Sequence, residues 1–163
     1  TDEEYIISRE PIPLGTGGAI KFAEKNFRSK QIFIFNGDSH IPFYFPSLFE
    51  FHKNCRADMS ILLSSATKGA DYGNVVLDVE NRITLFSEKP TKNTSPCVNA
   101  GVYVINRTLL SSLKLEKQYS LEKDCLPSWI HSHLIFGLLT NKPIYDIGTP
   151  ERYISSQTIL LEE

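Results

Sequence analysis

The stretch QIFIFNGD, residues 31–38, decides the fold that we expect for this chain. Its first six residues form a nearly continuous apolar run rich in Ile and Phe, and the run ends abruptly at Gly37. A strand that is buried on both faces has this pattern, because both alternating sets of side chains contact other layers of the protein. We therefore predict a buried strand in a parallel sheet that is covered by helices.

The segments on either side of this strand continue the pattern of an α/β domain. Residues 17–27 place apolar side chains at helical spacing with charged residues between them. A second helix is expected at about 46–54, and the run MSILLSS at 59–65 predicts a second buried strand. Helices that alternate with strands favour an α/β fold over an all-α or all-β fold.

One segment departs from this alternation. Residues 74–87, NVVLDVENRITLFS, alternate apolar and polar side chains on both sides of Glu80 and Asn81. Two alternating runs joined by a short polar turn predict an antiparallel hairpin. The predicted fold class is therefore α/β, a Rossmann-like three-layer arrangement with a mostly parallel sheet and an inserted antiparallel hairpin.

The remaining elements lie beyond the hairpin. Residues 97–105 predict another buried strand, and short helical patterns follow at about 108–113 and 120–126, the second of which Pro127 should end or kink. The last helix has a clear start, with Thr149 as N-cap followed by proline and glutamate.

Composition restricts the classes of partner. The chain has 163 residues, 41% of them apolar, and a formal net charge of -2. We expect a single domain over 1–163 that binds small molecules, with no nucleic-acid partner, because no basic stripe is present. Three separated cysteines predict neither a disulfide framework nor a zinc site and indicate a reducing cytosol. No apolar run approaches the ~20 residues of a membrane span, so a cytoplasmic location is predicted.

A glycine-rich turn, PLGTGGAI at 13–20, precedes the first predicted helix. Unpaired backbone N–H groups at a helix start can bind an anion. However, the turn lacks the Lys-Ser or Lys-Thr of a Walker loop and the GxGxxG register of a dinucleotide site. By itself it is a weak signal, because glycine clusters before helices are most often plain turns.

Two aspartates follow predicted strands. Asp38 comes directly after the strand at 31–36, and Asp146 follows a short extended run and precedes a glycine turn. In an open α/β sheet, ligands bind beyond the carboxyl ends of the strands. If the two carboxylates meet there, they can hold Mg²⁺ on a phosphate substrate. The alternative for each aspartate is an Asx turn or a helix N-cap.

The tripeptide Glu88-Lys89-Pro90 closes the hairpin. Pro90 favours an extended conformation for the residue before it, so the acid and the base point to opposite sides. Lys89 could then contact a phosphate and Glu88 could accept hydrogen bonds from hydroxyls. The alternative is an exposed strand end with two solvated charges.

Several motifs occur in one order, and together they resemble a single family, the sugar-1-phosphate nucleotidyltransferases. The heptose-1-phosphate and mannose-1-phosphate guanylyltransferase branch is the most similar. The motifs that carry the resemblance are PLGTGGAI, IFNGDS, YGNVVLD with ITLFSEKP, VNAGVYVI, SLEKDCLP and DIGTPERY.

The resemblance implies a reaction and a biosynthetic use for its product. The anomeric phosphate of a sugar attacks the α-phosphorus of a nucleoside triphosphate, here GTP by resemblance, and pyrophosphate leaves. Such chemistry depends on positioning and charge neutralisation, because the phosphate nucleophile is already ionised. The nucleotide-sugar product would serve lipopolysaccharide or capsule synthesis.

The resemblance also implies roles for individual residues. Asp38 and Asp146 match the Mg²⁺ pair, and with Lys89, which matches the lysine that binds the sugar phosphate, they would be catalytic. The sugar phosphate would be bound by Tyr72, Gly73, Glu88, Lys89 and Asn99. The nucleotide would lie against Asp38 and the turn residues Leu14, Gly15, Thr16, Gly17 and Gly18, where missing side chains admit base and ribose.

The sequence departs from the family at its beginning. The family opens with a strand and a GxGTRL loop, and neither precedes Tyr5. We expect that the opening βαβ unit is absent and that these 163 residues alone are impaired in turnover, since loss of a cationic clamp costs ~10³-fold or more in phosphoryl transfer. A sheet that lacks its central strand would expose an edge, which favours a homodimer.

Other functions stay open at this point. A non-catalytic sugar-phosphate-binding or assembly subunit would retain the same sugar pocket. A glucose-1-phosphate thymidylyl- or uridylyltransferase would use a different sugar and base. A GT-A glycosyltransferase is less favoured, because its DxD motif is not found.

Overall fold

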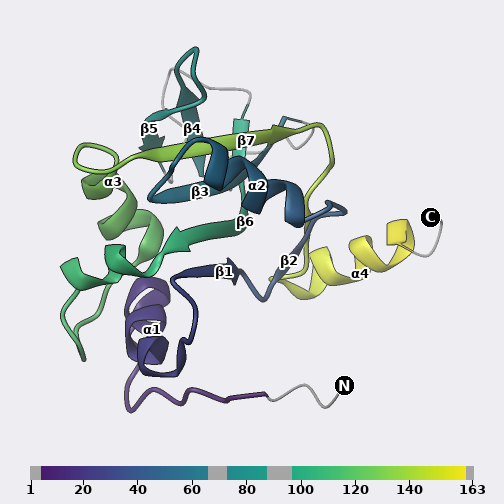
Figure 1. Cartoon of the computed structure of the whole chain (residues 1–163). Coiled ribbons are helices and arrows are strands. Elements are labelled where there is room, and N and C mark those ends of the chain that lie inside the picture. The colour runs from purple at the N-terminus through teal and green to yellow at the C-terminus, as the bar shows by residue number, and fades with distance from the viewer. Residues whose placement is uncertain (1–4, 66–72, 88–96, 161–163) are drawn as a thin grey trace.

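The computed structural model describes residues 5–65, 73–87 and 97–160 (Figure 1). A six-stranded sheet forms the centre, with the strand order β5-β4-β6-β3-β7 and with β1 also paired to β6. Its strands are β1 (Gln31–Phe35), β3 (Met59–Ser64), β4 (Asn74–Leu77), β5 (Ile83–Ser87), β6 (Cys97–Asn106) and β7 (Ile135–Thr140).

The strand directions confirm the predicted fold class. Strand β6 is antiparallel to β1, β3 and β4, whereas β3 and β7 are parallel. It follows that β1, β3, β4 and β7 run in one direction. The predicted hairpin is β4 and β5, which pair from Asn74 opposite Ser87 to the turn at Asn81, a residue with φ 65°.

Helices and short helical turns occupy nearly the predicted positions. Pro127, which we expected to end or kink a helix over 120–126, instead lies in the first turn of α3, where a missing N–H costs nothing. No helix in the described ranges is long and apolar enough to cross a membrane. The elements are α1 (Gly15–Ala23), η1 (Glu24–Asn26), α2 (Pro46–Asn54), η2 (Arg107–Ser112), the π-turn η3 (Leu121–Cys125), α3 (Leu126–Trp129) and α4 (Pro150–Leu160).

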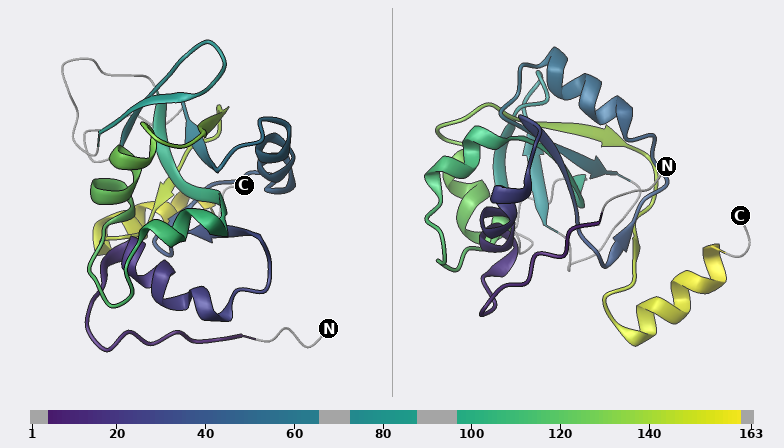
Figure 2. Two further views of the ribbon diagram at one scale, coloured as in Figure 1. Left: turned by 60° about the vertical axis from the view of Figure 1, so that its left-hand side comes forward. Right: turned by 60° about the horizontal axis from the view of Figure 1, so that its bottom comes forward.

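The two faces of the sheet bury separate hydrophobic clusters, which makes the fold three-layered. Alternate residues of a strand point to opposite faces, so Ile61 and Tyr103 join the cluster under α1, η2, η3 and α3. Leu62 and Val104 join the cluster under α2, which contributes Leu48. The views in Figure 2 show α2 on the opposite side of the sheet from α1 and α3.

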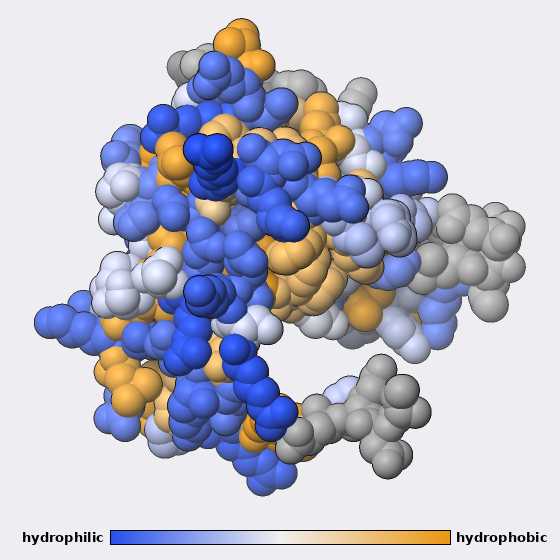
Figure 3. All heavy atoms as spheres, viewed as in Figure 1, coloured by the Kyte–Doolittle hydropathy of each residue, from blue (hydrophilic) through white to orange (hydrophobic). Residues whose placement is uncertain are grey.

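Strand β1 is not buried on both faces, so that prediction is wrong. Ile32 and Ile34 pack against the first cluster, but Phe33 and Phe35 are 38% and 51% exposed. The reason is the position of β1 at an edge, because within the described ranges it pairs only with β6. Figure 3 shows apolar side chains at the surface between α2 and β1.

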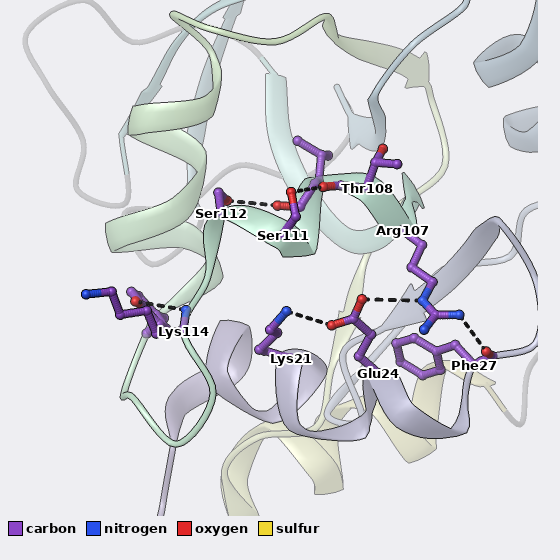
Figure 4. Close-up of polar contacts among 10 residues, drawn as sticks. Lys21, Glu24, Phe27, Arg107, Thr108, Ser111, Ser112 and Lys114 are labelled. Carbon is purple, nitrogen blue, oxygen red and sulfur yellow. Dashed lines mark hydrogen bonds and ion pairs between the residues drawn. The ribbon is translucent and has the colours of Figure 1, made fainter.

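A cluster of charges holds the end of α1 against the end of β6 (Figure 4). Glu24 accepts hydrogen bonds from Lys21 Nζ at 2.7 Å and from Arg107 Nε at 3.3 Å. Arg107 Nη1 also donates to the carbonyl oxygen of Phe27 at 2.9 Å. The hydrogen bond from Lys21, with a further contribution from Arg107, lowers the pKa of Glu24 despite its partial burial. These contacts hold the end of α1 beside the amino end of β1, because Arg107 follows Asn106, which pairs with Gln31.

Candidate functional site

A short antiparallel ribbon brings two predicted site residues together. Strand β2 (Ser39–His40) pairs with β8 (Tyr145–Asp146), with Ser39 opposite Asp146. The backbone N–H of Ile147 donates to the carbonyl oxygen of Asp38 at 2.8 Å. A Cβ added to Gly148 would lie 3.2 Å from Asp146 Oδ1 and 3.5 Å from Asp38 Oδ2. The two carboxylates therefore lie near the same small space beside Gly148, where an added Cβ would be tight against Asp146 and in ordinary contact with Asp38.

Asp146 is held from several directions. Its Oδ1 accepts from the N–H of Gly148 at 2.8 Å, and its Oδ2 accepts from Arg152 Nη1 at 2.7 Å. The hydroxyl of Ser156 donates to its backbone carbonyl at 3.1 Å. Asp38, in contrast, is exposed. Asp146 is therefore fixed in orientation, whereas Asp38 is open to solvent and ligands.

The donor chemistry of this pair suits a hard cation. Carboxylate oxygens are the ligands that Mg²⁺ prefers, and Mg²⁺ usually retains several waters or substrate oxygens beside one or two carboxylates. Among the described residues no cluster of three or more His, Cys, Asp or Glu side chains could hold a metal ion. A cation at Asp38 and Asp146 would thus have coordination positions left for phosphate oxygens.

The aspartate pair borders a polar cavity of about 330 Å³. Of the residues predicted for the sugar phosphate, Gly73 and Asn99 line this cavity, together with Thr16 from the glycine-rich turn. Gly73 also leaves room for Phe86, whose Cζ would be 2.9 Å from an added Cβ. The structure therefore brings together residues from five separate parts of the sequence. The predicted residues Tyr72, Glu88 and Lys89 lie outside the described ranges.

Glu122 also lines the polar cavity, and the sequence interpretation did not single it out. Its Oε2 accepts from the hydroxyl of Thr16 at 2.9 Å, and its Oε1 accepts from Tyr103 at 3.1 Å. Asn99 Nδ2 donates to the same tyrosine oxygen at 2.7 Å. The sequence offered one signal, the carboxylate within the motif SLEKDCLP, but only the π-turn η3 directs it into the cavity.

The surroundings of Glu122 keep the Tyr103 hydroxyl and the nearby Cys125 thiol protonated. Burial, followed by the charge of Glu122, raises the pKa of Tyr103 above its usual range. Burial, followed by the charges of Asp124 and Glu122, raises the pKa of Cys125 to about 12. Neither group is therefore a base or a nucleophile near neutral pH.

The structure shows how the glycines of the turn pack against the rest of the chain. The N–H groups of Gly17 and Gly18 both donate to the carbonyl oxygen of Tyr119, at 3.0 and 3.2 Å. Gly15 has φ +71°, and an added Cβ would lie 2.5 Å from that same oxygen. These positions therefore require glycine, because the segment 117–125 packs closely against them. Leu14 is completely buried, and Thr16 lines the polar cavity.

A second, mostly apolar cavity of about 450 Å³ adjoins the first. Ile20, Ile34, Phe35 and Leu121 contribute to its wall. Both cavities are lined by Thr16, Asn36 and Asp38. An apolar compartment and a polar compartment that meet at a carboxylate suit a ligand with a flat apolar part and a phosphate part.

The family follows from the sequence as a whole. A family model described as nucleotidyl transferase matches residues 2–163. The chain belongs to the nucleotidyl transferase family. The resemblance predicted from the ordered motifs is therefore confirmed.

Curated relatives of this nucleotidyl transferase chain include two guanylyltransferases. D-glycero-alpha-D-manno-heptose 1-phosphate guanylyltransferase of Aneurinibacillus thermoaerophilus is 31% identical over 153 residues, which are 94% of this chain and 65% of that protein. Mannose-1-phosphate guanylyltransferase of Mycobacterium tuberculosis is 29% identical over 160 residues, which are 97% of this chain and 44% of that protein. The chain thus spans about half to two thirds of the length of these relatives.

Solved structures agree with this assignment. HddC from Yersinia pseudotuberculosis has a TM-score of 0.79 and 26% identity, over 93% of this chain and 64% of that one. The same protein complexed with GMP-PN gives a TM-score of 0.76 and 27% identity. A glucose-1-phosphate thymidylyltransferase from Bacillus anthracis, at 15% identity and a TM-score of 0.78, shares the fold.

Proposed function

We propose that this nucleotidyl transferase chain takes part in the transfer of a guanylyl group from GTP to a sugar 1-phosphate. The sugar phosphate is either D-glycero-D-manno-heptose 1-phosphate or mannose 1-phosphate. The observation that carries the proposal is the placement of Asp38 and Asp146 together beside Gly148, in the wall of a polar cavity of about 330 Å³. Two carboxylates in the wall of a polar cavity match the chemistry that the family performs.

The reaction needs no strong base. An oxygen of the sugar phosphate forms a bond to the α-phosphorus of GTP, the bond from that phosphorus to the bridging oxygen breaks, and pyrophosphate leaves with the bonding electrons. The attacking phosphate is already ionised at neutral pH. The raised pKa values of Tyr103 and Cys125 fit this requirement, since neither side chain competes as a nucleophile.

The carboxylate pair supports a role for Mg²⁺. Asp38 and Asp146 would hold the cation, which would neutralise charge on the phosphates during transfer. Gly73 and Asn99 would contact the sugar phosphate in the polar cavity, with Glu122 supporting Asn99 through Tyr103. The apolar cavity would take the nucleoside. Tyr72, Glu88 and Lys89 keep their predicted roles at the sugar phosphate.

The choice of base and compartment rests on the relatives and on the cysteines. The names of the two relatives support guanine and a heptose or mannose phosphate. None of the three cysteines forms a disulfide within the described structure, which fits the proposed cytosolic location. The product would be an activated sugar for lipopolysaccharide or capsule assembly.

Pyrophosphate release tests the proposal directly. The protein is incubated with Mg²⁺, one of GTP, dTTP or UTP, and one of the heptose, mannose or glucose 1-phosphates. Release that is greatest with GTP and heptose or mannose 1-phosphate supports the proposal. Tight binding of a sugar phosphate by calorimetry without any release would instead favour a non-catalytic subunit. Release only with dTTP or UTP and glucose 1-phosphate would contradict the proposed substrates.

A further inference from the structure

An arginine occupies the position next to the carboxylate pair. Arg152 lies in the first turn of α4, and its Nη1 is 2.7 Å from Asp146 Oδ2. Its side chain is 40% exposed and that of Asp146 is 20% exposed. The ion pair is therefore accessible to water and to ligands that enter beside α4.

The location of Arg152 is unfavourable for the helix itself. The first turn carries the positive end of the helix dipole, so a cation there is destabilising, whereas an anion such as Glu151 is favoured. The helix has other start signals, because Thr149 Oγ1 accepts from the backbone N–H of Arg152 at 3.3 Å and Pro150 takes the first position. Formation of α4 therefore does not require an arginine at this position.

Nor does Asp146 need Arg152 to hold its place. The pairing with Ser39, the hydrogen bond from the N–H of Gly148 and the hydrogen bond from Ser156 already hold its backbone and one carboxylate oxygen. What Arg152 adds is a positive charge on the other oxygen, Oδ2, whereas Oδ1 is the oxygen that shares the space beside Gly148 with Asp38. Its contribution is therefore electrostatic.

Charge and geometry together imply exchange. A divalent cation that uses Asp146 Oδ2 has to take that oxygen from the guanidinium, and a half-exposed ion pair is weak enough to be replaced. The displaced guanidinium would remain close to Asp146, which lines the polar cavity, and its planar set of donors matches phosphate oxygens.

We propose that Arg152 is an exchangeable counter-ion, which neutralises Asp146 until a divalent cation binds and then contacts a phosphate group of the bound ligand. The inference rests on the proposed function, because it takes Asp38 and Asp146 as the metal pair. It adds a positioning residue on α4 whose partner changes between the metal-free and the metal-bound protein.

Mn²⁺ binding measured by electron paramagnetic resonance tests the exchange without any turnover. Wild-type protein, Arg152→Gln, Asp146→Asn and Arg107→Gln are titrated with Mn²⁺ alone and with Mn²⁺ plus inorganic pyrophosphate. Arg107→Gln is the matched control, because it also removes one arginine charge from an ion pair, with Glu24, away from the site.

Arg152→Gln should bind Mn²⁺ alone roughly two- to fivefold more tightly than wild type, the range set by a half-exposed ion pair. It should bind the Mn²⁺–pyrophosphate complex several-fold more weakly, and Arg107→Gln should change neither affinity. Equal or weaker Mn²⁺ binding by Arg152→Gln would overturn the inference, as would unchanged pyrophosphate binding. If Asp146→Asn binds Mn²⁺ as well as wild type does, the metal pair of the proposed function fails and the exchange fails with it. If Asp146→Asn loses Mn²⁺ binding but Arg152→Gln binds Mn²⁺ as wild type does, the exchange is contradicted and the metal pair is retained.

Discussion

Ser39 and Asp146 lie directly opposite each other in the antiparallel β2–β8 ribbon, and this pairing delivers Asp38 to the side of Asp146. The two aspartates come from opposite ends of the sequence. The ribbon joins the loop after β1 to the segment before α4, so the proposed metal pair depends on a contact between remote segments of the chain.

Replacement of Asp38 by asparagine should weaken Mn²⁺ binding about tenfold or more, because an amide oxygen lacks the charge that a hard cation prefers. Asp38 is exposed, so the midpoint of urea unfolding should hardly change. Electron paramagnetic resonance of free Mn²⁺ measures the affinity. Glu50→Gln, an exposed carboxylate on α2, is the control. Full Mn²⁺ affinity in Asp38→Asn would remove Asp38 from the metal pair.

Replacement of Tyr103 by phenylalanine should lower the free energy of unfolding by about 1–2 kcal/mol, because Asn99 and Glu122 lose a buried partner. Urea denaturation with unchanged slope measures this. Tyr153→Phe is the matched control, since that hydroxyl accepts a hydrogen bond from Gln157 at an exposed position. Its effect should stay within about 0.5 kcal/mol. Equal effects in the two variants would argue against a stabilising network.

Replacement of Gly15 by alanine should destabilise the fold by about 2–4 kcal/mol, from the left-handed backbone and from overlap with the carbonyl oxygen of Tyr119. Thermal and urea unfolding measure the loss. Gly37→Ala is the comparison, because an added Cβ there meets nothing within 4 Å. We expect that variant to be neutral or slightly stabilised. A Gly15→Ala protein as stable as wild type would contradict the packing role of the turn.

The buried His52 should make stability depend on pH. Its Nδ1 is 3.0 Å from Ser60 Oγ and its Nε2 is 3.3 Å from Asn106 Oδ1, and burial lowers its pKa despite the opposing effects of Asn106 and Asp58. As the pH falls below about 6.5, the unfolded chain binds a proton that the folded chain resists. The contribution of His52 is therefore complete above that pH and is lost as the pH falls toward the lowered folded pKa.

Urea unfolding between about pH 7.5 and 5.5 should show this loss, with a slope of at most ~1.4 kcal/mol per pH unit for one proton. His52→Gln should remove most of the slope, although it is less stable at pH 7.5. His131→Gln, at an exposed position, should retain the slope. A wild-type slope that survives in His52→Gln would assign the titration to another group.

Local pattern was sufficient to predict most elements of the fold. The helix at 46–54 and the strand at 59–64 match the structure closely, because side-chain period and burial along one segment determine each. The start of α4 was predicted for the same reason, since an N-cap needs only neighbouring residues. The ordered motifs were sufficient for the family.

Contacts between segments decided what local pattern could not. The apolar run at 31–35 reads the same in a central strand and at an edge, so the exposure of Phe33 and Phe35 emerged only from the pairing of β1. The sequence also did not show that the segment around Tyr119 packs against Gly15 and Gly17, because that contact joins residues about 100 positions apart.

The sequence by itself determined the α/β class, the family and the aspartates worth testing, because each is recorded in residue types and in spacing along the chain. The tertiary structure decided that Asp38 meets Asp146, that Glu122 enters the polar cavity and that Arg152 pairs with the predicted metal ligand. The reason is physical. A side chain's partner depends on which strands pair and where helices pack. Both depend on how apolar surface is buried over the whole chain.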